Sequence, residues 1–258
     1  MKSAIKVGRG LLRKPAWARL LGRRVCLVTE PEAHRRFGRK LLEALRREGI
    51  DAALHLLPAG EAAKTLACVH SIYRTLVRSG LGRDGGVIAL GGGAVTDAAG
   101  FAAATYLRGV PWITVPTTLL GQVDSGIGGK TGVNIAEGKN LVGAFHQPRA
   151  VICDLAVLDS LPLREVISGL GEAVKYGLVF DRAFFDRMRR DWDRLLALDP
   201  LALAPVVRRC AALKAEIVAK DERETSGLRE LLNFGHTVGH ALEAEAGYGT
   251  LRHGEAVV

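Results

Sequence analysis

Cysteine is scarce in this sequence, and its few cysteines are far apart. Cys26, Cys68, Cys153 and Cys210 all lie in apolar surroundings, and no two of them form a Cys-x-x-Cys pair. A disulfide framework, or a zinc site with sulfur ligands, needs several cysteines at short spacings. The sequence therefore argues against both, and we expect buried, reduced thiols.

Long hydrophobic runs are missing as well. No uninterrupted apolar run approaches the roughly 20 residues that a membrane-spanning helix needs, and we recognise no secretory leader followed by a small-residue cleavage site. Aromatic residues make up only 5% of the chain and are not interleaved with basic ones. We therefore expect a cytoplasmic protein with no membrane partner and no nucleic-acid partner.

Acidic residues are absent from the start of the chain. The net charge of +9 comes almost wholly from this stretch, where eight cations precede Glu30: Lys2, Lys6, Arg9, Arg13, Lys14, Arg19, Arg23 and Arg24. A transit segment and a nucleic-acid binder are the two alternatives that rest on it. However, Ile5-Lys6-Val7 followed by Gly8 and Gly10 predicts a strand and a turn. If that strand packs into a domain, the nucleic-acid alternative loses its only support.

The hydrophobic content of 48% suffices for one large core or two modest ones. Short apolar runs alternate with helical patterns up to about residue 160; we expect strands at 25–28, 52–57, 87–90 and 113–115, and helices at 33–48 and 63–79. This alternation predicts an α/β class with an N-terminal, Rossmann-like parallel-sheet nucleotide-binding domain over residues 1–160.

A mostly helical metal- and substrate-binding domain is expected over residues 161–258. Amphipathic patterns predict helices at 164–179, 181–198, 201–222 and 229–246. The last segment stops in an apolar run without a cap, so we expect this domain to be C-terminally incomplete. We then expect weak or absent activity, with exposed apolar surface at Ala256, Val257 and Val258.

A glycine-rich turn follows one predicted strand. Val87–Leu90 leads into Gly91-Gly92-Gly93 and a helix start that contains Asp97. Successive glycines let backbone N–H groups approach a pyrophosphate at a helix N-terminus, although a tight strand-to-helix turn explains the run equally well. The G-x-G-x-x-G pattern of a strict Rossmann dehydrogenase is not present.

A second glycine-rich run ends in Gly129-Lys130-Thr131, which invites a P-loop interpretation. A P-loop requires a glycine five residues before its Gly-Lys pair, and Asp124 stands there. The spacing therefore argues against a nucleoside-triphosphatase.

Two helical spacings suggest a metal site. Glu172 and Lys175 lie one turn apart, which a surface ion pair would also explain. His236 and His240 are four residues apart, and His253 follows; such imidazoles with a carboxylate suit zinc or a related divalent ion. Thr237 stands where a His-Glu-x-x-His protease carries its base, so a zinc protease is disfavoured.

Taken in order, these segments resemble the 3-dehydroquinate synthase family of sugar-phosphate cyclases, from about residue 5 to the last residue. The motifs that carry the resemblance are Gly60-Glu61 with Lys64, Gly91-Gly92-Gly93 with Asp97, Pro116-Thr117-Thr118, Asp124 through Gly132, Lys139 through Gly143, Gly171-Glu172 with Lys175-Tyr176-Gly177, and Asn233 through His240 with His253-Gly254-Glu255.

The resemblance implies a reaction. The family converts a phosphorylated keto acid, 3-deoxy-arabino-heptulosonate 7-phosphate, into 3-dehydroquinate and phosphate, a step of the shikimate pathway to aromatic amino acids. Transient oxidation by NAD is followed by phosphate elimination, return of the hydride and an intramolecular aldol closure. The resemblance also implies a homodimer and a metal ion, zinc or cobalt.

The resemblance also implies site residues. Glu172, His236 and His253 would bind the metal, and His240 would contact substrate or relay a proton. The other substrate and catalytic positions are Arg108, Asp124, Lys130, Asn140, Lys175, Lys214, Arg229 and Asn233. The NAD positions are Gly60, Glu61, Lys64, Gly93, Ala94, Val95, Thr96, Asp97, Thr117, Thr118, Lys130 and Lys139, with Val157, Leu158, Asp159 and Ser160.

Two rival enzymes share these features. Another cyclase, such as a 2-deoxy-scyllo-inosose or epi-valiolone synthase, would use a substrate without the carboxylate; Arg229, Asn233 and His240 favour the acid substrate. An iron or zinc alcohol dehydrogenase of the glycerol-dehydrogenase type would release NADH instead of recycling it.

Overall fold

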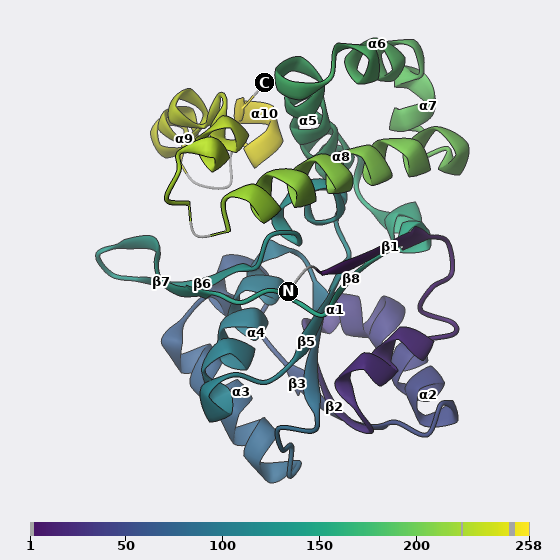
Figure 1. Cartoon of the computed structure of the whole chain (residues 1–258), viewed down its shortest axis with the longest axis vertical. Helices are drawn as coiled ribbons and strands as arrows, with labels where there is room; N and C mark the ends of the chain where they lie inside the picture. Colours follow the sequence, from purple (N-terminus) through teal and green to yellow (C-terminus); the bar gives the residue numbers. More distant parts are fainter. Residues whose placement is uncertain (1–2, 223, 248–250, 258) are drawn as a thin grey trace. The chain divides into compact units, whose positions relative to one another are not determined.

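The computed structural model describes residues 3–222, 224–247 and 251–257, with only the backbone described at His240 and Ala244 (Figure 1). The chain forms two compact units. The first, here called the sheet unit, comprises Met1–Thr117 and Gly129–Asp154; the second, the helical unit, comprises Thr118–Gly128 and Leu155–Val258. The domain boundary expected at residue 160 stays a prediction.

The sheet unit is built on a parallel six-stranded sheet, as expected for a Rossmann-like fold. In sheet order its strands are β1 (Ala4–Gly8), β8 (Ala150–Asp154), β5 (Trp112–Pro116), β4 (Gly86–Gly91), β2 (Arg24–Thr29) and β3 (Asp51–Leu56). The basic start of the chain therefore lies in a packed sheet, because β1 pairs with β8 from Ala4↔Ala150 to Gly8↔Asp154. The nucleic-acid alternative loses the support that it had.

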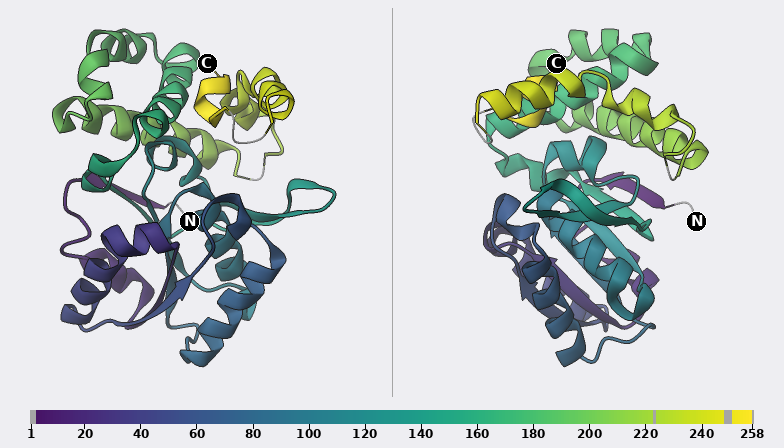
Figure 2. Two further views of the ribbon diagram at one scale, coloured as in Figure 1. Left: turned by 180° about the vertical axis from the view of Figure 1, so that it is seen from behind. Right: turned by 90° about the vertical axis from the view of Figure 1, so that its left-hand side faces the viewer.

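Helices cover both faces of this sheet (Figure 2). One core packs α3 (Leu66–Arg78) and α4 (Gly93–Thr105) against side chains such as Cys26 and Val28; the other packs η1 (Ala16–Leu21) and α2 (Arg39–Arg47) against Val25 and Leu27. Successive strand residues point to opposite faces, and both faces are buried. This explains why β2 is an unbroken apolar run.

Shorter helical turns complete the sheet unit: α1 (Pro31–Ala33), η2 (His34–Gly38), η3 (Gly60–Ala63) and η4 (Tyr106–Arg108).

An antiparallel hairpin is an addition that the sequence patterns did not predict. It consists of β6 (Lys130–Ile135) and β7 (Gly138–Phe145). Its glycines interrupt the alternation of apolar and polar residues, which hides the strands from a pattern search. A side chain at Gly143 would overlap the backbone carbonyl of Thr131, so close pairing needs glycine there.

The helical unit is mostly helical, as predicted, with helices that range from five to 21 residues. They are α5 (Leu163–Phe180), α6 (Arg182–Arg190), α7 (Trp192–Leu196), α8 (Pro200–Lys220), α9 (His236–Glu245) and α10 (His253–Val257), with short turns η5 (Gly121–Ser125), η6 (Leu155–Ser160) and η7 (Leu228–Asn233). Asp181 and Asp199 accept hydrogen bonds from the first turns of α6 and α8, as N-caps do.

Two of the predicted helices are broken in the structure. The expected helix 181–198 is interrupted at Asp191, between α6 and α7. The expected helix 229–246 is interrupted because Phe234 is extended (ψ 130°) and Gly235 has a left-handed backbone (φ 79°). The second break places His236 at the first position of α9.

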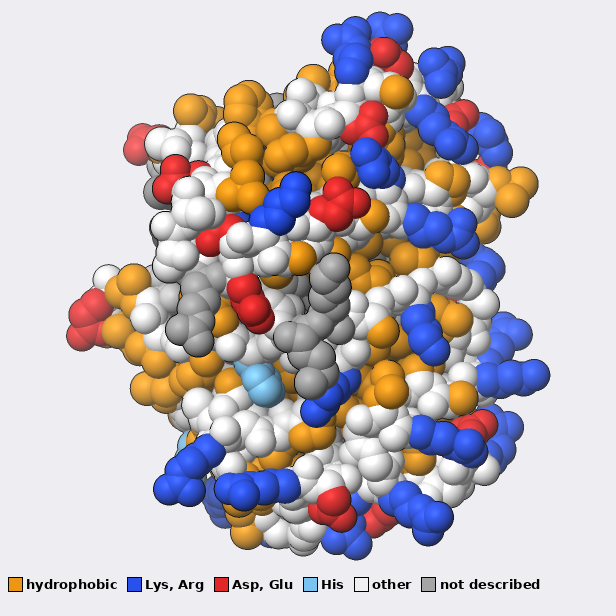
Figure 3. Space-filling view, viewed as in Figure 1, with side chains coloured by type: hydrophobic (Ala, Val, Ile, Leu, Met, Phe, Trp, Pro, Cys, Tyr) orange, Lys and Arg blue, Asp and Glu red, His pale blue; other side chains and the backbone are white. Residues whose placement is uncertain are grey.

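The expected apolar exposure at the last residues is wrong for the two that are described. Ala256 and Val257 are each only 8% exposed, because α10 packs against α5 and α9; Val258 lies outside the described residues. Exposed apolar side chains occur elsewhere in the unit, on α5 (Leu163, Ile167) and α9 (Val238, Leu242), where Figure 3 shows hydrophobic atoms gathered.

Among the described helices, none combines the length and apolarity needed to cross a membrane.

Candidate functional site

Three helices of the helical unit bring a carboxylate and two imidazoles together. Glu172 lies in the middle of α5, His236 begins α9 and His253 begins α10. The two histidine Nε2 atoms are 3.1 Å apart, and Glu172 Oε1 lies 3.4 Å from His253 Nε2 and 3.8 Å from His236 Nε2. One donor atom from each residue thus converges on a common point.

These separations suit a tetrahedral metal ion. With metal–ligand bonds of about 2.0–2.2 Å, tetrahedral geometry puts neighbouring donor atoms about 3.3–3.6 Å apart. The three observed separations, 3.1, 3.4 and 3.8 Å, bracket that value. Two nitrogens and one oxygen are a donor set for zinc or a similar divalent ion, and three protein ligands leave a position for substrate.

Close backbone packing brings His253 to Glu172. A side chain on Gly254 would overlap the carbonyl oxygen of Ser168, and one on Gly171 would overlap the carbonyl of Gly254. The Gly254 N–H donates to Ser168 Oγ at 3.1 Å, which closes the contact with a buried hydrogen bond. Glycine at both positions therefore allows α10 to lie directly on α5.

A two-pronged ion pair holds the same two helices together. Arg164 on α5 donates to Glu255 on α10, from Nε at 2.9 Å and from Nη2 at 2.8 Å. The Arg252 N–H donates to the same carboxylate at 2.8 Å. These contacts lower the pKa of Glu255 to about 2, with the Arg164 hydrogen bond as the largest cause.

Glu172 is fully buried, yet neither of its oxygens has a well-formed hydrogen bond from the described part of the chain. Its charge is balanced by an ion pair with Lys175, one turn further along α5, whose Nζ also donates to the Leu232 carbonyl at 2.6 Å. Removing one partner of such a buried pair typically costs about 3–5 kcal/mol. A buried carboxylate with unused lone pairs is what a cation site needs.

The two imidazoles differ in electrostatic environment. Burial and the nearby Lys175 lower the pKa of His236. Burial also works to lower the pKa of His253, but the adjacent Glu172 carboxylate, 3.4 Å from its Nε2, and the charge of Glu243 outweigh it and raise this pKa. Both rings are therefore tied electrostatically to Glu172.

A second polar cluster of the helical unit surrounds Asp124 in η5. The Lys214 ammonium on α8 lies 2.8 Å from Asp124 Oδ1 and donates to its carbonyl at 2.9 Å. The Tyr176 hydroxyl donates to the same Oδ1 at 2.6 Å. Burial works to raise the pKa of Asp124, but the charges of Lys214 and Lys175 lower it well below its usual range. Asp124 is therefore an anion at neutral pH.

Arg229 is the third cation of this unit that is almost fully buried among the described residues, after Lys175 and Lys214. Its Nε lies 3.2 Å from Glu224 Oε1, and its Nη1 donates to the Glu222 carbonyl at 3.0 Å. Asn233, four residues further on, is exposed, and the side chain of His240 lies outside the described residues.

Of the NAD positions in this unit, Thr118 is half-buried, Val157 and Leu158 are buried, and Asp159 and Ser160 are exposed.

The sheet unit carries the predicted glycine turn at the carboxyl end of β4. Helix α4 begins at Gly93, and no side chain caps its first turn. A side chain on Gly91 would overlap Val95, which keeps the turn tight, and the Thr117 N–H donates to the Gly91 carbonyl at 3.0 Å. Uncapped N–H groups at a helix N-terminus can bind a phosphate.

Predicted NAD residues form a network beside this turn. The buried Lys64 ammonium lies 2.7 Å from Asp97 Oδ2 and also donates to Asn140 Oδ1. Asn134 donates to Glu61 at 2.6 Å and accepts from the Asn140 N–H at 2.9 Å, which joins the hairpin to η3. Asn134 was not among the predicted residues, because an isolated asparagine in a strand gives no spacing signal.

The remaining predicted residues of the sheet unit are exposed. Lys130 and Lys139 lie on the hairpin, Gly60 lies in η3, and Arg108 ends η4 with a left-handed backbone (φ 64°). The structure thus gathers Gly60, Glu61, Lys64, residues 93–97 and Asn140 around one end of the sheet. It distributes the predicted substrate residues over both units.

Two family profiles match consecutive parts of this chain. Residues 54–168 match the family profile described as "3-dehydroquinate synthase N-terminal", and residues 169–258 match "3-dehydroquinate synthase C-terminal". A 3-dehydroquinate synthase of Desulforamulus reducens is 48% identical over 252 residues, which cover 98% of this chain and 68% of that protein.

The chain belongs to the 3-dehydroquinate synthase family.

Solved structures of related cyclases have the same fold. A 2-epi-5-epi-valiolone synthase from Streptomyces hygroscopicus subsp. jinggangensis 5008, with NAD+ and Zn2+ bound, superposes with a TM-score of 0.91 at 33% identity, over 100% of this chain and 72% of that one. A 2-deoxy-scyllo-inosose synthase complexed with carbaglucose-6-phosphate, NAD+ and Co2+ gives 0.88 at 28% identity, over 98% and 70%. The chain spans about two thirds of the length of its family relative.

One residue beside the metal cluster of this family member was missed by sequence reasoning. Glu243 Oε1 lies 3.3 Å from His253 Nδ1, on the side of the ring away from Glu172. Metal-binding imidazoles are commonly oriented by such a carboxylate. Glu243 stands ten residues before His253 in no recognisable motif, so only the structure reveals it.

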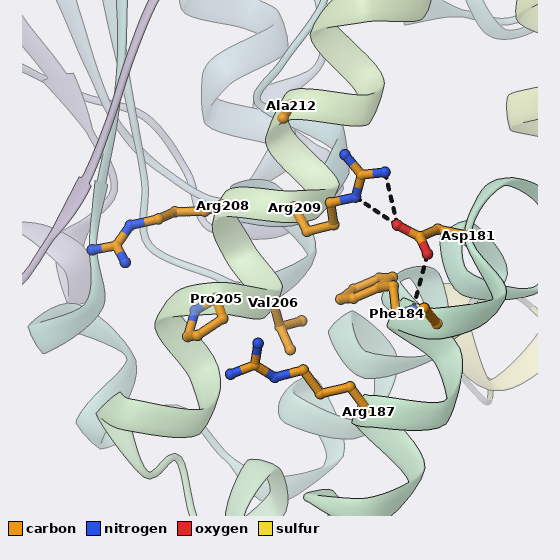
Figure 4. A pocket seen from close by; sticks show the side chains of 9 residues that line it. Asp181, Phe184, Arg187, Pro205, Val206, Arg208, Arg209 and Ala212 are labelled. Atoms are coloured by element: carbon orange, nitrogen blue, oxygen red, sulfur yellow. Dashed lines mark hydrogen bonds and ion pairs between the residues drawn. The ribbon is translucent and has the colours of Figure 1, made fainter.

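A separate hollow of about 490 Å³ lies between α6 and α8 (Figure 4). Phe184, Pro205, Val206 and Ala212 give it an apolar lining, and the Asp181–Arg209 ion pair (2.7 Å) lies at its side. It contains none of the residues that the 3-dehydroquinate synthase resemblance implies. The candidate site is therefore assigned from the convergence of Glu172, His236 and His253, and not from this hollow.

Proposed function

We propose that this chain is a 3-dehydroquinate synthase, which converts 3-deoxy-arabino-heptulosonate 7-phosphate into 3-dehydroquinate and phosphate. One observation carries the proposal: in a member of this family, Glu172, His236 and His253 bring three donor atoms together at separations of 3.1–3.8 Å. Curated family members that carry this name are the second support.

Glu172, His236 and His253 would hold a zinc or cobalt ion, which supplies Lewis acidity for oxidation of a substrate hydroxyl. Lys175 neutralises the remaining charge of Glu172 and keeps that carboxylate buried. Glu243 would orient His253 through its Nδ1. The metals bound in the two related cyclases support this assignment.

The sheet unit would hold NAD, which supplies a reversible hydride acceptor. The uncapped first turn of α4 would bind the pyrophosphate through its backbone N–H groups, and the buried Lys64 would fix the neighbouring Asp97. Glu61, Thr117, Lys130 and Lys139, all in the sheet unit, are proposed as further contacts. NAD+ in both related cyclases supports this part.

The substrate is proposed to be a phosphorylated keto acid. Lys175, Lys214 and Arg229 place three cations in the buried part of the helical unit, and Asp124 fixes the position of Lys214. Cations suit a ligand that bears a carboxylate and a phosphate, with arginine offering two parallel hydrogen bonds. A cyclase whose sugar-phosphate substrate lacks the carboxylate is the second candidate, supported by the structural likeness to two related cyclases.

A cytoplasmic homodimer is proposed for the assembled protein. Four free thiols, two of them with a pKa raised to about 12 by burial (Cys26 and Cys153), suit a reducing compartment. The exposed apolar side chains of α5 and α9 provide a surface that a second subunit would cover.

The test is release of inorganic phosphate from the heptulosonate phosphate, with NAD supplied in catalytic amount. We expect phosphate release to stop when zinc is chelated and to return when zinc is restored. NADH should not accumulate, because the hydride returns in each cycle. Steady NADH accumulation with a simple alcohol substrate would contradict the proposal, and turnover of glucose 6-phosphate in its place would favour the second candidate.

A further inference from the structure

Tyr176 is a fully buried tyrosine whose hydroxyl meets the carboxylate of Asp124. It lies on α5, four residues after Glu172, so both side chains project from one face of the helix. Its hydroxyl donates to Asp124 Oδ1 at 2.6 Å, the short distance typical of a hydrogen bond to an anion. The function proposed above gives Tyr176 no role.

Both side-chain contacts of Asp124 end on the same oxygen. Tyr176 donates to Oδ1, and the Lys214 ammonium lies 2.8 Å from the same atom. No described residue donates a hydrogen bond to Oδ2. This atom is also not fully buried, and the Asp124 side chain keeps 18% of its surface exposed. Oδ2 is therefore the oxygen open to a ligand.

The tyrosine is a permanent donor in this position. Burial, followed by the charge of Asp124 and the hydrogen bond to it, raises the pKa of Tyr176 well above its usual value. The hydroxyl is therefore protonated at neutral pH and can donate. Lys214 contacts both the Asp124 carbonyl, at 2.9 Å, and Oδ1, so Tyr176 is the second donor that restrains the rotation of the carboxylate.

We propose that Tyr176 is a positioning residue: its hydroxyl fixes Oδ1 of Asp124 so that Oδ2 is presented to the substrate. The inference rests on the proposed function, because it assigns Asp124 to the substrate site. It also ties η5 to the helix that carries Glu172, so the two parts of the site share one support.

A double-mutant cycle tests this role. Tyr176→Phe removes only the hydroxyl, and Asp124→Asn removes the charge that it positions. We expect Tyr176→Phe to lower kcat/KM for phosphate release by roughly tenfold or more, the usual effect of one hydrogen bond to a charged group. In the double variant the loss should equal that of Asp124→Asn alone within about twofold, because Tyr176 acts through Asp124.

Tyr73→Phe is the matched control. The Tyr73 hydroxyl makes a hydrogen bond of the same length, 2.6 Å, to Thr105 Oγ1 in the sheet unit. This variant should keep kcat/KM within about twofold of the unaltered protein. Bound zinc, measured by elemental analysis, should be the same in all variants, which separates positioning from collapse of the metal cluster.

The same variants are then compared for the dissociation constant of the heptulosonate phosphate, measured by calorimetry on zinc-loaded, NAD-free protein. Without NAD no hydride transfer takes place, so the titration measures binding alone. If the unaltered protein binds the heptulosonate phosphate but releases no phosphate with NAD, the proposed function fails while the cycle still reports on Tyr176. The positioning role would be overturned if the loss of kcat/KM or of affinity in the double variant were the product of the two single losses. It would also be overturned if Tyr176→Phe changed neither quantity.

Discussion

Glu172 has no contact with solvent, so its charge is balanced only by the groups around it. Those groups are Lys175 and two imidazoles, of which one has a raised and one a lowered pKa. A neutral amide at this position would keep the shape but lose the charge that attracts a metal ion. The residue-scale prediction follows from this arrangement.

Glu172→Gln and His236→Ala are each expected to lower zinc affinity by at least roughly 100-fold, because each removes one of three protein ligands. Metal content after dialysis and a competition titration with a chromophoric chelator measure the change. His240→Ala should retain zinc, since the resemblance assigns that residue to substrate. Zinc retained by the first two variants would refute the metal assignment.

At the residue scale, sequence spacing alone was an incomplete guide. Two histidines four apart on one helix suggest a pair, which would join His236 to His240. In the structure His253 lies beside His236, with their Nε2 atoms 3.1 Å apart, while the side chain of His240 lies outside the described residues. The break at Gly235 starts a new helix at His236, and α10 then supplies His253. Spacing carries no information about such tertiary contacts; the resemblance to a known family supplied it.

At the element scale, the site depends on how α10 lies on α5. Gly254→Ala would place a methyl group against the Ser168 carbonyl and push the two helices apart. We expect a loss of about 1–3 kcal/mol in the free energy of unfolding, together with weaker zinc binding, because His253 precedes Gly254 directly.

Thermal unfolding and zinc titration of Gly254→Ala check this prediction. Ser168→Ala is the graded control, because it removes the hydrogen bond to the Gly254 N–H without adding volume. Its effect should be smaller than that of Gly254→Ala. An alanine at 254 that leaves both quantities unchanged would argue against the close helix contact.

The Arg164–Glu255 ion pair makes the attachment of α10 sensitive to acid. The folded-state pKa of Glu255, about 2, lies below its ordinary value of 4.5, so its stabilising effect is present above about pH 4.5 and is lost as pH falls through 2. Glu255→Gln should therefore lower the urea midpoint at pH 7 but hardly at pH 2. Glu230→Gln, at an exposed position of η7, is the control and should show no such pH-dependent difference.

The elements themselves were largely predictable where the apolar pattern is strong. The buried strands β2, β4 and β5 and the helices α5 and α8 were expected within a few residues. Three features escaped: the hairpin β6–β7, the strand β8 and the breaks inside two helices. Glycine-rich hairpin strands lack a clear period of two, and a single glycine with positive φ ends a helix without changing its apolar period.

At the scale of the whole molecule, exposed apolar side chains favour self-association. Val238 and Leu242 lie one turn apart on α9 and expose 64% and 47% of their surface, while Leu163 and Ile167 form a similar pair on α5. Contacts between copies through these faces would remove that surface from water.

Replacing Val238 and Leu242 together by serine should weaken self-association about tenfold or more, measured by sedimentation velocity over a range of concentrations. Zinc content should not change. Leu201→Ser, which alters an exposed leucine on α8 (79% exposed), is the matched control. An unchanged association constant in the double variant would place the contact surface elsewhere.

The metal cluster joins points of the chain that are far apart in sequence. Glu172 belongs to one helix, and the two histidines begin two others, of which the first follows only after a long intervening segment. A bound ion would therefore act as a three-way cross-link that closes one large loop and one short loop, much as a disulfide closes one. Zinc uptake would then mark a late event of folding, because no local fragment of the chain can assemble all three ligands. Refolding with and without zinc should differ mainly in the slowest phase, when the last helix joins the rest.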